Sequence, residues 1–173
     1  MYQKVAKLLR KMFRDDQVFK YGFNFSPMYR RSTGRIRQVS RDLLKVEVEI
    51  PLSYKNRNYV GAIFGGSMLS ATDPIYMIQL MHILGDQYVV WDKSATIKYR
   101  RPARENINAT FEFSEDEILT IKNQVSEQNE IDLVKKLNIL NTRDEVVAQL
   151  EKTIYIASKT YYKKKQLARG RRR

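Results

Sequence analysis

The sequence predicts an α+β fold in which an antiparallel sheet of about six strands wraps around one buried helix, with a second helix inserted after the fourth strand. Several segments, such as Leu44–Ile50, alternate apolar and charged residues, which is typical of strands with one face in the core. The segment from Phe64 to Leu84 is apolar around most of a helical circumference, which predicts a buried helix. Such a helix needs a sheet around it to be soluble.

The remaining elements follow from local patterns. Arg35–Ser40 and Leu44–Ile50 predict two strands joined by a tight turn, and Asn106–Phe113 predicts another. Ser114 followed by Glu117 forms a capping box, which predicts a helix to about Gln128. Residues 133–141 and 145–157 predict a hairpin, whose second strand alternates at Val146, Ala148, Leu150, Ile154 and Ile156.

The segment Tyr88–Arg101 also alternates, and it carries a lysine on its apolar face. We expect Lys93 to reach the sheet edge with its long side chain, which is a more common role than catalysis. The other residues predicted on this face are Val89, Trp91, Ala95, Ile97 and Tyr99.

The net charge of +13 belongs to the two ends of the chain. Residues 1–41 hold eleven Lys/Arg against two acids, and residues 158–173 hold eight Lys/Arg and no acid, whereas the segment between them is mildly acidic. We therefore divide the chain into a basic amphipathic helix and loop (1–32), one folded domain (33–157) and a disordered basic tail (158–173). Contact of the ends with nucleic acid or an anionic membrane is an alternative that we do not favour; the other interpretation is that they serve only solubility.

The composition excludes several kinds of site. The chain has no cysteine and one histidine, so we expect no thiol nucleophile, no metal site and no cofactor. Phosphate-binding glycine motifs and the G-x-S-x-G nucleophile motif are absent from the sequence. No signal peptide or transmembrane segment is evident, and the lack of cysteine is consistent with a cytoplasmic location.

Asp73 is the one formally charged residue in the apolar stretch Asn58–Gly85. A carboxylate in such a segment is costly to bury without a partner, which makes Asp73 a candidate functional residue. Thr72-Asp73-Pro74 also fits a helix start, so Asp73 serves either as a helix cap or as a reactive group. On a continuous helix, Gly66, Ser70, Met77 and Leu80 would share its face.

The glycine pair Gly65-Gly66 lies at the predicted start of this helix. Amide N–H groups at a helix start are unpaired and lie at the positive end of the helix dipole. They are suited to holding the oxyanion of a thioester or carboxyl group.

The spacing from Asn58 through Gly61 and Phe64-Gly65-Gly66 to Asp73 resembles that of hotdog-fold thioesterases, especially the phenylacetate-degradation type of acyl-CoA thioesterase. Those enzymes have a His-Gly-Gly helix start, and this chain resembles the branch that reads Phe-Gly-Gly. The resemblance covers roughly residues 33–157. It implies Asp73 as nucleophile or general base, Gly66 as oxyanion donor and Asn58 as a positioner of water or carbonyl.

The resemblance also implies an acyl-CoA or other acyl-thioester substrate and a homodimer or dimer of dimers. Phe64 in place of histidine leaves open a non-catalytic acyl-binding or scaffold role. Residues predicted to line the substrate site are Gly65, Phe64, Ser70 and Met77. A basic cluster would meet the CoA phosphates or form a solvated strand end; it comprises Lys98, Arg100, Arg101 and Arg104.

Overall fold

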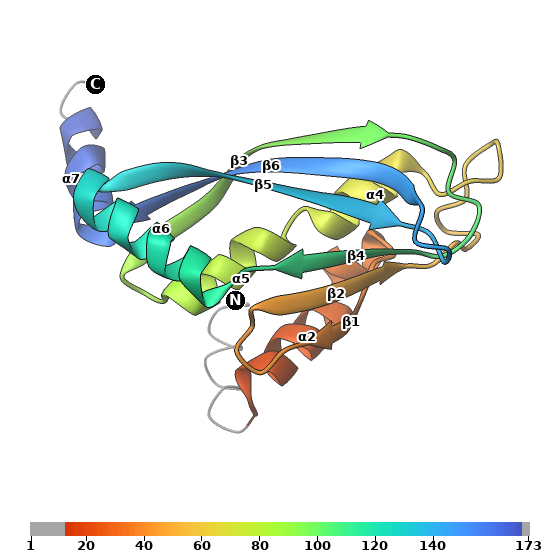
Figure 1. Ribbon diagram of the computed structural model, residues 1–173, viewed down its shortest axis with the longest axis horizontal. Helices are drawn as coiled ribbons and strands as arrows, with labels where there is room; N and C mark the ends of the chain where they lie inside the picture. Colours follow the sequence, from red (N-terminus) through yellow and green to blue (C-terminus); the bar gives the residue numbers. More distant parts are fainter. Residues whose placement is uncertain (1–12, 171–173) are drawn as a thin grey trace.

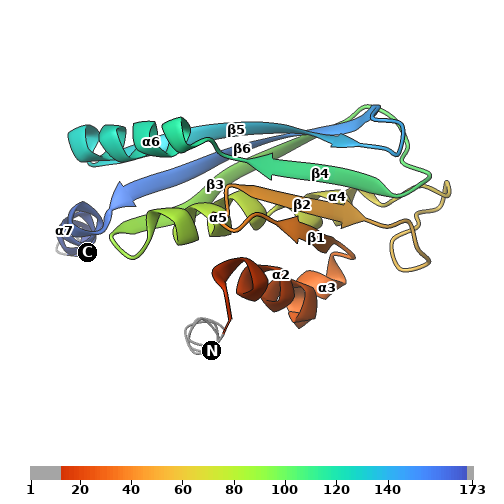
Figure 2. The same ribbon diagram turned by 60° about the horizontal axis from the view of Figure 1, so that its bottom comes forward.

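Six strands form one antiparallel sheet in the order β1-β2-β4-β5-β6-β3. The computed structural model describes residues 13–170. The sheet curls around the central helices α4 and α5, and α6 follows the fourth strand (Figures 1 and 2). The predicted architecture is confirmed. The elements are α2 (Asp15–Phe25), α3 (Pro27–Arg31), β1 (Arg35–Val39), β2 (Lys45–Ile50), α4 (Gly65–Thr72), α5 (Ile75–Leu84), β3 (Tyr88–Tyr99), β4 (Ile107–Glu112), α6 (Glu115–Gln128), β5 (Glu130–Leu140), β6 (Val146–Ser158) and α7 (Lys159–Gly170).

The core lies between the inner face of the sheet and the central helices. Burial alternates along β2 and β4, as the period of two predicted. Helix α6 begins as expected, because the Ser114 hydroxyl accepts the Glu117 amide N–H at 3.0 Å. The core includes Val46, Val48, Ile50, Ile75, Leu80, Ile107, Ala109, Phe111, Leu150 and Ile154.

The central helix is interrupted at Asp73-Pro74, where α4 ends and α5 begins. Proline has no N–H to continue the helical hydrogen bonds. In a continuous helix that N–H would donate to the Ser70 carbonyl. The next carbonyl, that of Ala71, accepts from the hydroxyl of the fully buried Tyr29 at 2.9 Å. No side chain caps the start of α5, and the Thr72 hydroxyl donates back to the Met68 carbonyl. The helix-cap interpretation of Thr72-Asp73 is therefore wrong.

Strand β3 contains a bulge, and the side chains before the bulge lie on the opposite faces of the sheet from those predicted. Its pairing with β6 shifts between Asp92 and Ser94. A bulge inserts one extra residue, so the side chains before it alternate out of step with those after it. The prediction that Val89 and Trp91 share a face with Ala95, Ile97 and Tyr99 is therefore wrong. Lys93 lies at the bulge, and its Nζ is 2.6 Å from an Asp132 carboxylate oxygen.

The segment before β1 is helical, although a loop was predicted to follow the basic amphipathic helix within residues 1–32. Helix α2 packs along β1, with Phe19 in the core. The Asn24 amide side chain closes the contact, because it exchanges two 2.9 Å hydrogen bonds with the Ile36 backbone. The basic amphipathic helix predicted at the start of residues 1–32 lies largely outside the described residues, which begin at Phe13.

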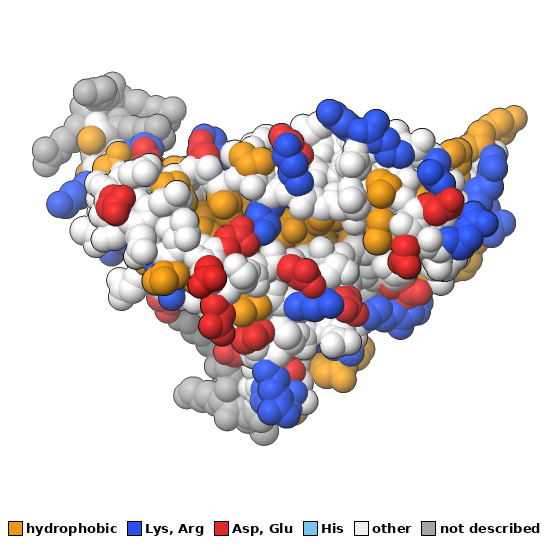
Figure 3. Space-filling view, viewed as in Figure 1, with side chains coloured by type: hydrophobic (Ala, Val, Ile, Leu, Met, Phe, Trp, Pro, Cys, Tyr) orange, Lys and Arg blue, Asp and Glu red, His pale blue; other side chains and the backbone are white. Residues whose placement is uncertain are grey.

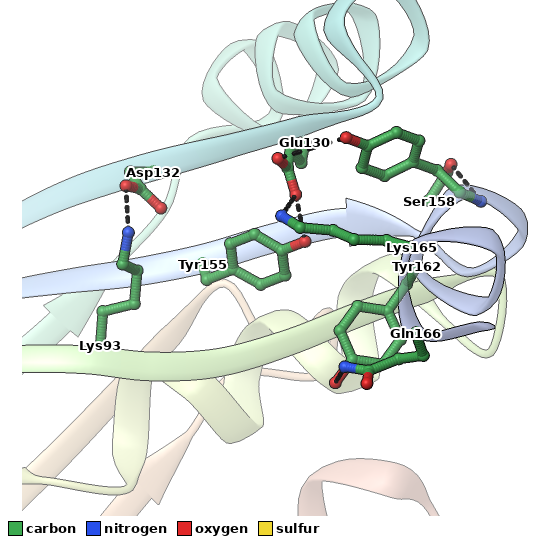
Figure 4. A network of polar contacts seen from close by, with 9 residues as sticks. Lys93, Glu130, Asp132, Tyr155, Ser158, Tyr162, Lys165 and Gln166 are labelled. Atoms are coloured by element: carbon green, nitrogen blue, oxygen red, sulfur yellow. Dashed lines mark hydrogen bonds and ion pairs between the residues drawn. The ribbon is translucent and has the colours of Figure 1, made fainter. Parts of the chain in front are cut away.

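Residues 159–170 form helix α7 rather than the predicted disordered tail. Figure 4 shows how the helix is held: Glu130 of β5 accepts from both Lys165 of α7 and the Tyr155 hydroxyl. The Trp91 ring packs against those of Tyr155 and Tyr162, with centroids 5.0 and 5.4 Å away. Composition alone missed the helix because these tertiary contacts offset the repulsion among its lysines.

Candidate functional site

The first turn of α4 presents two glycine amides. Phe64 precedes the helix and makes no side-chain cap. Within residues 13–170, neither the Gly65 nor the Gly66 N–H has an acceptor, as is normal for the first turn of a helix. Because the helix dipole is positive at this end, the turn is suited to holding a negatively charged oxygen.

Two aromatic rings pack closely against this glycine pair. A Cβ atom on Gly65 would lie 2.5 Å from the Tyr99 hydroxyl, and one on Gly66 would lie 2.3 Å from Cε1 of Phe64. Both rings are more than half exposed, and partial burial raises the pKa of Tyr99. The glycines are thus required where they stand unless the rings move.

Asp73 lies at the break between α4 and α5, and it has a partner. Its Oδ1 is 3.1 Å from Nζ of Lys152, which also donates to the Asp73 main-chain carbonyl. The Asp73 side chain is 54% exposed. No described residue donates a hydrogen bond to its second oxygen, Oδ2. One carboxylate oxygen is therefore held and the other is available.

Lys152 is a fully buried cation on the inner face of the sheet. It extends from β6 between the buried side chains of Leu150 and Ile154, and its side chain is 0% exposed. Its third contact is with Oδ2 of Asp92, at 2.6 Å. An ammonium has three N–H groups. The main-chain carbonyl and Oδ1 of Asp73, together with Oδ2 of Asp92, therefore accept all three.

Asp92 completes this cluster of three charged residues. The bulge in β3 turns its side chain inward, where it is 20% exposed. Burial raises the pKa of Asp92 and the nearby Asp73 adds to this, whereas the hydrogen bond from Lys152 lowers it. Its Oδ1 is buried, and no described residue donates to it.

Lys152 was not among the site residues predicted from the sequence, although a signal was present. The alternating residues of β6 run Ala148, Leu150, Ile154 and Ile156, and position 152 falls in the same inward register. A lysine in an otherwise apolar register is a buried-charge signal. No such signal marked Asp92, since the bulge that turns it inward is not visible in the alternation.

Three other predicted site residues make local contacts. Oδ1 of Asn58 accepts from the amides of Val60 and Ala62 at 3.1 and 3.0 Å, which stabilises the loop before α4. The Ser70 hydroxyl donates to the Gly66 carbonyl at 2.7 Å. Met77 packs against the core from α5. None of these contacts reaches Asp73.

The predicted basic cluster is divided between two surface cavities. Lys98 lines one of about 300 Å³ on the sheet, beside Gln149, which binds Arg100. Arg101 and Arg104 line another of about 220 Å³. Lys and Arg side chains gather over the end of the molecule that carries the β2–α4 loop (Figures 1 and 3). Neither cavity is lined by Asp73 or the glycine pair.

The described part of the chain contains no group of three or more acidic, histidine or cysteine side chains arranged to hold a metal ion. Among the helices of residues 13–170, none is long and apolar enough to cross a membrane.

An antiparallel sheet in this order, wrapped around a central helix with a glycine turn at its start, defines a hotdog-fold protein. Residues 16–156 match the model of the family described as "Domain of unknown function (DUF4442)", and the chain belongs to that family. No curated protein matches the sequence.

Solved structures share the fold at low sequence identity. One is a protein of unknown function from Pseudomonas aeruginosa, described as a probable thioesterase, with a TM-score of 0.73, 18% identity, and coverage of 82% of this chain and 95% of that one. A protein of unknown function from Chlorobaculum tepidum has a TM-score of 0.63, 17% identity, and coverage of 90% and 96%. A thioesterase from Haemophilus influenzae has a TM-score of 0.61, 13% identity, and coverage of 86% and 94%.

Proposed function

We propose that the protein hydrolyses acyl thioesters such as acyl-CoA. The observation that carries the proposal is the state of Asp73: Lys152 holds Oδ1, no described residue donates to Oδ2, and the side chain is 54% exposed. Two supports are independent of it. The glycine turn offers free amides, and two of the structures that share the fold are described as thioesterases or probable thioesterases.

In the proposed reaction, Asp73 Oδ2 takes a proton from water as the water oxygen attacks the thioester carbonyl carbon. The Gly66 N–H, beside that of Gly65, stabilises the oxyanion that forms. Collapse of the intermediate breaks the C–S bond and releases a carboxylic acid and a thiolate, which takes the proton from Asp73 to become the thiol and restores the carboxylate. Direct attack by Asp73 would instead form an anhydride and expel the thiolate; 18O would enter the Asp73 side chain in a single turnover where water attacks the aspartyl carbonyl of that anhydride.

The proposed site requires a second chain. Seven residues of helix separate Gly66 from Asp73, which is about 10 Å at the α-helical rise. One thioester carbonyl cannot contact both. We therefore propose a homodimer in which Asp73 of one protomer faces the glycine turn of its partner. Strand β3 is at the end of the sheet, and its free edge is suited to pairing with a second copy.

The basic residues would bind the CoA phosphates outside the reaction centre. Arg101 and Arg104 share their cavity with Arg143, and guanidinium groups pair well with phosphate. The exposed ring of Phe64, packed over Gly66, would contact the thioester in place of a polar side chain. Asn58 is retained in this proposal only as an organiser of the loop before the glycine turn.

The test is the hydrolysis of an acyl-CoA panel by the native protein and by Asp73→Asn. We expect turnover by the native protein and a loss of at least about 100-fold in kcat in Asp73→Asn, because general-base catalysis contributes that much. Asp144→Asn, an exposed change in the β5–β6 turn, is the matched control. Equal turnover by the native protein and Asp73→Asn, or none by the native protein on any chain length, contradicts the proposal.

One observation favours a second candidate, a non-catalytic acyl-binding protein. The Phe64 ring lies against Gly66, where it restricts access to the proposed oxyanion donor. This alternative predicts that acyl-CoA raises the melting temperature of the native protein and of Asp73→Asn equally, with no hydrolysis by either.

A further inference from the structure

We propose that Lys152 is a positioning residue for Asp73, and that Asp92 is the counter-ion that keeps Lys152 in place while Asp73 changes its charge. This inference rests on the proposed function, because it specifies how the reactive carboxylate is oriented and charged. It concerns two residues that the resemblance to thioesterases does not assign.

The contacts assign separate tasks to the two oxygens of Asp73. Lys152 donates to Oδ1 and also to the main-chain carbonyl of the same residue. Two bonds from one ammonium to one residue fix both the backbone and the side chain at the helix break. Oδ2 is then left without a donor among the described residues, on a side chain that is 54% exposed, so it is free to accept a proton from water.

Asp92 keeps Lys152 paired with a negative charge during the proposed reaction. When Asp73 takes a proton, its charge is neutralised, and Lys152 would become an unpaired buried cation, which is strongly unfavourable. Its 2.6 Å contact with Asp92 persists through that step. The ammonium therefore has a fixed partner and a partner whose charge varies.

The alternative is a purely structural role, in which Lys152 only caps the last carbonyl of α4. Position 152 lies between Leu150 and Ile154 in the core, where an apolar side chain would avoid the desolvation of a cation. The cluster also leaves Oδ1 of Asp92 buried without a donor in the described part of the chain. A cap alone accounts for neither cost.

The absence of cysteine from the sequence permits a test that separates charge from shape. Lys152→Cys introduces the only thiol. Alkylation in denaturant with 2-bromoethylamine, followed by refolding, restores a side chain of lysine length that ends in an ammonium. Alkylation with 2-bromoethanol gives the same length with a neutral hydroxyl, which can still donate to the Asp73 carbonyl.

We expect the aminoethyl protein to regain turnover of acyl-CoA, and the hydroxyethyl protein to have a kcat lower by about 100-fold, the usual effect of misplacing a catalytic group. KM should differ little between them, because Lys152 has no exposed surface with which to contact substrate. Equal kcat in the two proteins, at matched melting temperatures, overturns the inference. If neither refolds, Lys152→Arg and Lys152→Met, produced by expression, repeat the comparison.

A second readout does not depend on turnover. Carbodiimide coupling of a small amine labels carboxyl groups, and mass spectrometry gives the rate at Asp73 relative to that at the exposed Asp144. An ammonium bound to the carboxylate should slow its labelling, so Asp73 should react faster in the hydroxyethyl protein. Equal labelling rates overturn the inference even if the native protein hydrolyses no thioester, whereas absence of turnover with unequal labelling overturns only the proposed function.

Discussion

Lys152 Nζ donates both to the carboxylate and to the main-chain carbonyl of Asp73, a residue 79 positions earlier in the chain. The contact connects the middle of the last strand to the break between the two central helices. It supplies a positive charge to the C-terminus of α4, where the helix dipole is negative. The same contact therefore stabilises the fold and orients the proposed reactive group.

Removing the buried cation should destabilise the protein strongly. We expect Lys152→Met to lower the free energy of unfolding by about 3–5 kcal/mol, because it leaves Asp92 with a buried and uncompensated charge. Adding Asp92→Asn should recover part of this loss. Urea unfolding of the two single variants and the double variant measures the coupling.

The control is Lys93→Met on the neighbouring strand. Lys93 and Asp132 form an ion pair in which both side chains are nearly half exposed, so its loss should cost less than about 1 kcal/mol. Equal destabilisation by Lys152→Met and Lys93→Met would contradict the assignment of Lys152 as a buried, fully paired cation.

The hydrogen bond from Tyr29 to Ala71 should be measurable by removal of one oxygen atom. Tyr29→Phe leaves the Ala71 carbonyl without a donor inside the protein and should cost about 1–3 kcal/mol, the penalty for an unsatisfied buried acceptor. Tyr59→Phe, at a fully exposed ring, should have no effect. Thermal unfolding of both variants tests this, and a neutral Tyr29→Phe would show that water replaces the hydroxyl.

Gly66 and Phe64 should show energetic coupling. In the native background, Gly66→Ala places a Cβ atom against the Phe64 ring and should be destabilising. In a Phe64→Ala background the clash is absent, so the same change should be neutral or stabilising by up to about 1 kcal/mol, since alanine favours helix. A double-mutant cycle from denaturant unfolding gives the coupling energy, and additive effects would contradict the close packing.

The docking of α7 should depend on pH through Glu130. Hydrogen bonds from Lys165 and then Tyr155 hold the pKa of Glu130 below its ordinary value. Its contribution to stability is therefore complete above the pKa of an unfolded glutamate, about 4.3, and is lost as the pH falls through the lower folded value. We expect α7 to loosen in that acidic range.

Trp91, the single tryptophan, reports on this change because it packs against Tyr162 of α7. Its fluorescence should change as the pH falls below about 4, and Glu130→Gln should produce the low-pH signal at neutral pH. Glu151→Gln, which removes the partner of the exposed Lys136, should leave the signal unchanged. An unaltered signal in Glu130→Gln would contradict the role of Glu130 in holding α7.

Local pattern was sufficient to predict the strands, because the alternation of apolar and polar residues shows which face of a strand is buried; the first half of β3, before its bulge, is the exception. The alternation in Lys45–Ile50 and the capping serine Ser114 both predicted what the structure contains. Helix α2 and helix α7 were missed because their stability comes from tertiary contacts. Asn24 binds the Ile36 backbone and Lys165 binds Glu130, and neither partner is identifiable from neighbouring residues.

Only the residues that the central helices contribute to the candidate site were predicted from the sequence. Asp73 and the glycine turn were found because an acid in an apolar stretch and a glycine pair are visible in a single segment. Lys152 was detectable from its register in β6, but its pairing with Asp73 required the strand to be placed beside the helix break. Asp92 could not be found at all, since its direction depends on the bulge at Lys93.

That bulge also bears on how other members of the family should be compared with this chain. If β3 paired with β6 at its present length but without the bulge, Asp92 would turn outward and Trp91 would turn into the core. The carboxylate would then leave Lys152, and α7 would lose the ring on which it packs. The pairing of Asp92 with Ile154 and of Ser94 with Thr153 would survive loss of the residue between them. An acid aligned with Asp92, rather than the segment length, is thus the marker of which relatives can hold a buried lysine at this position.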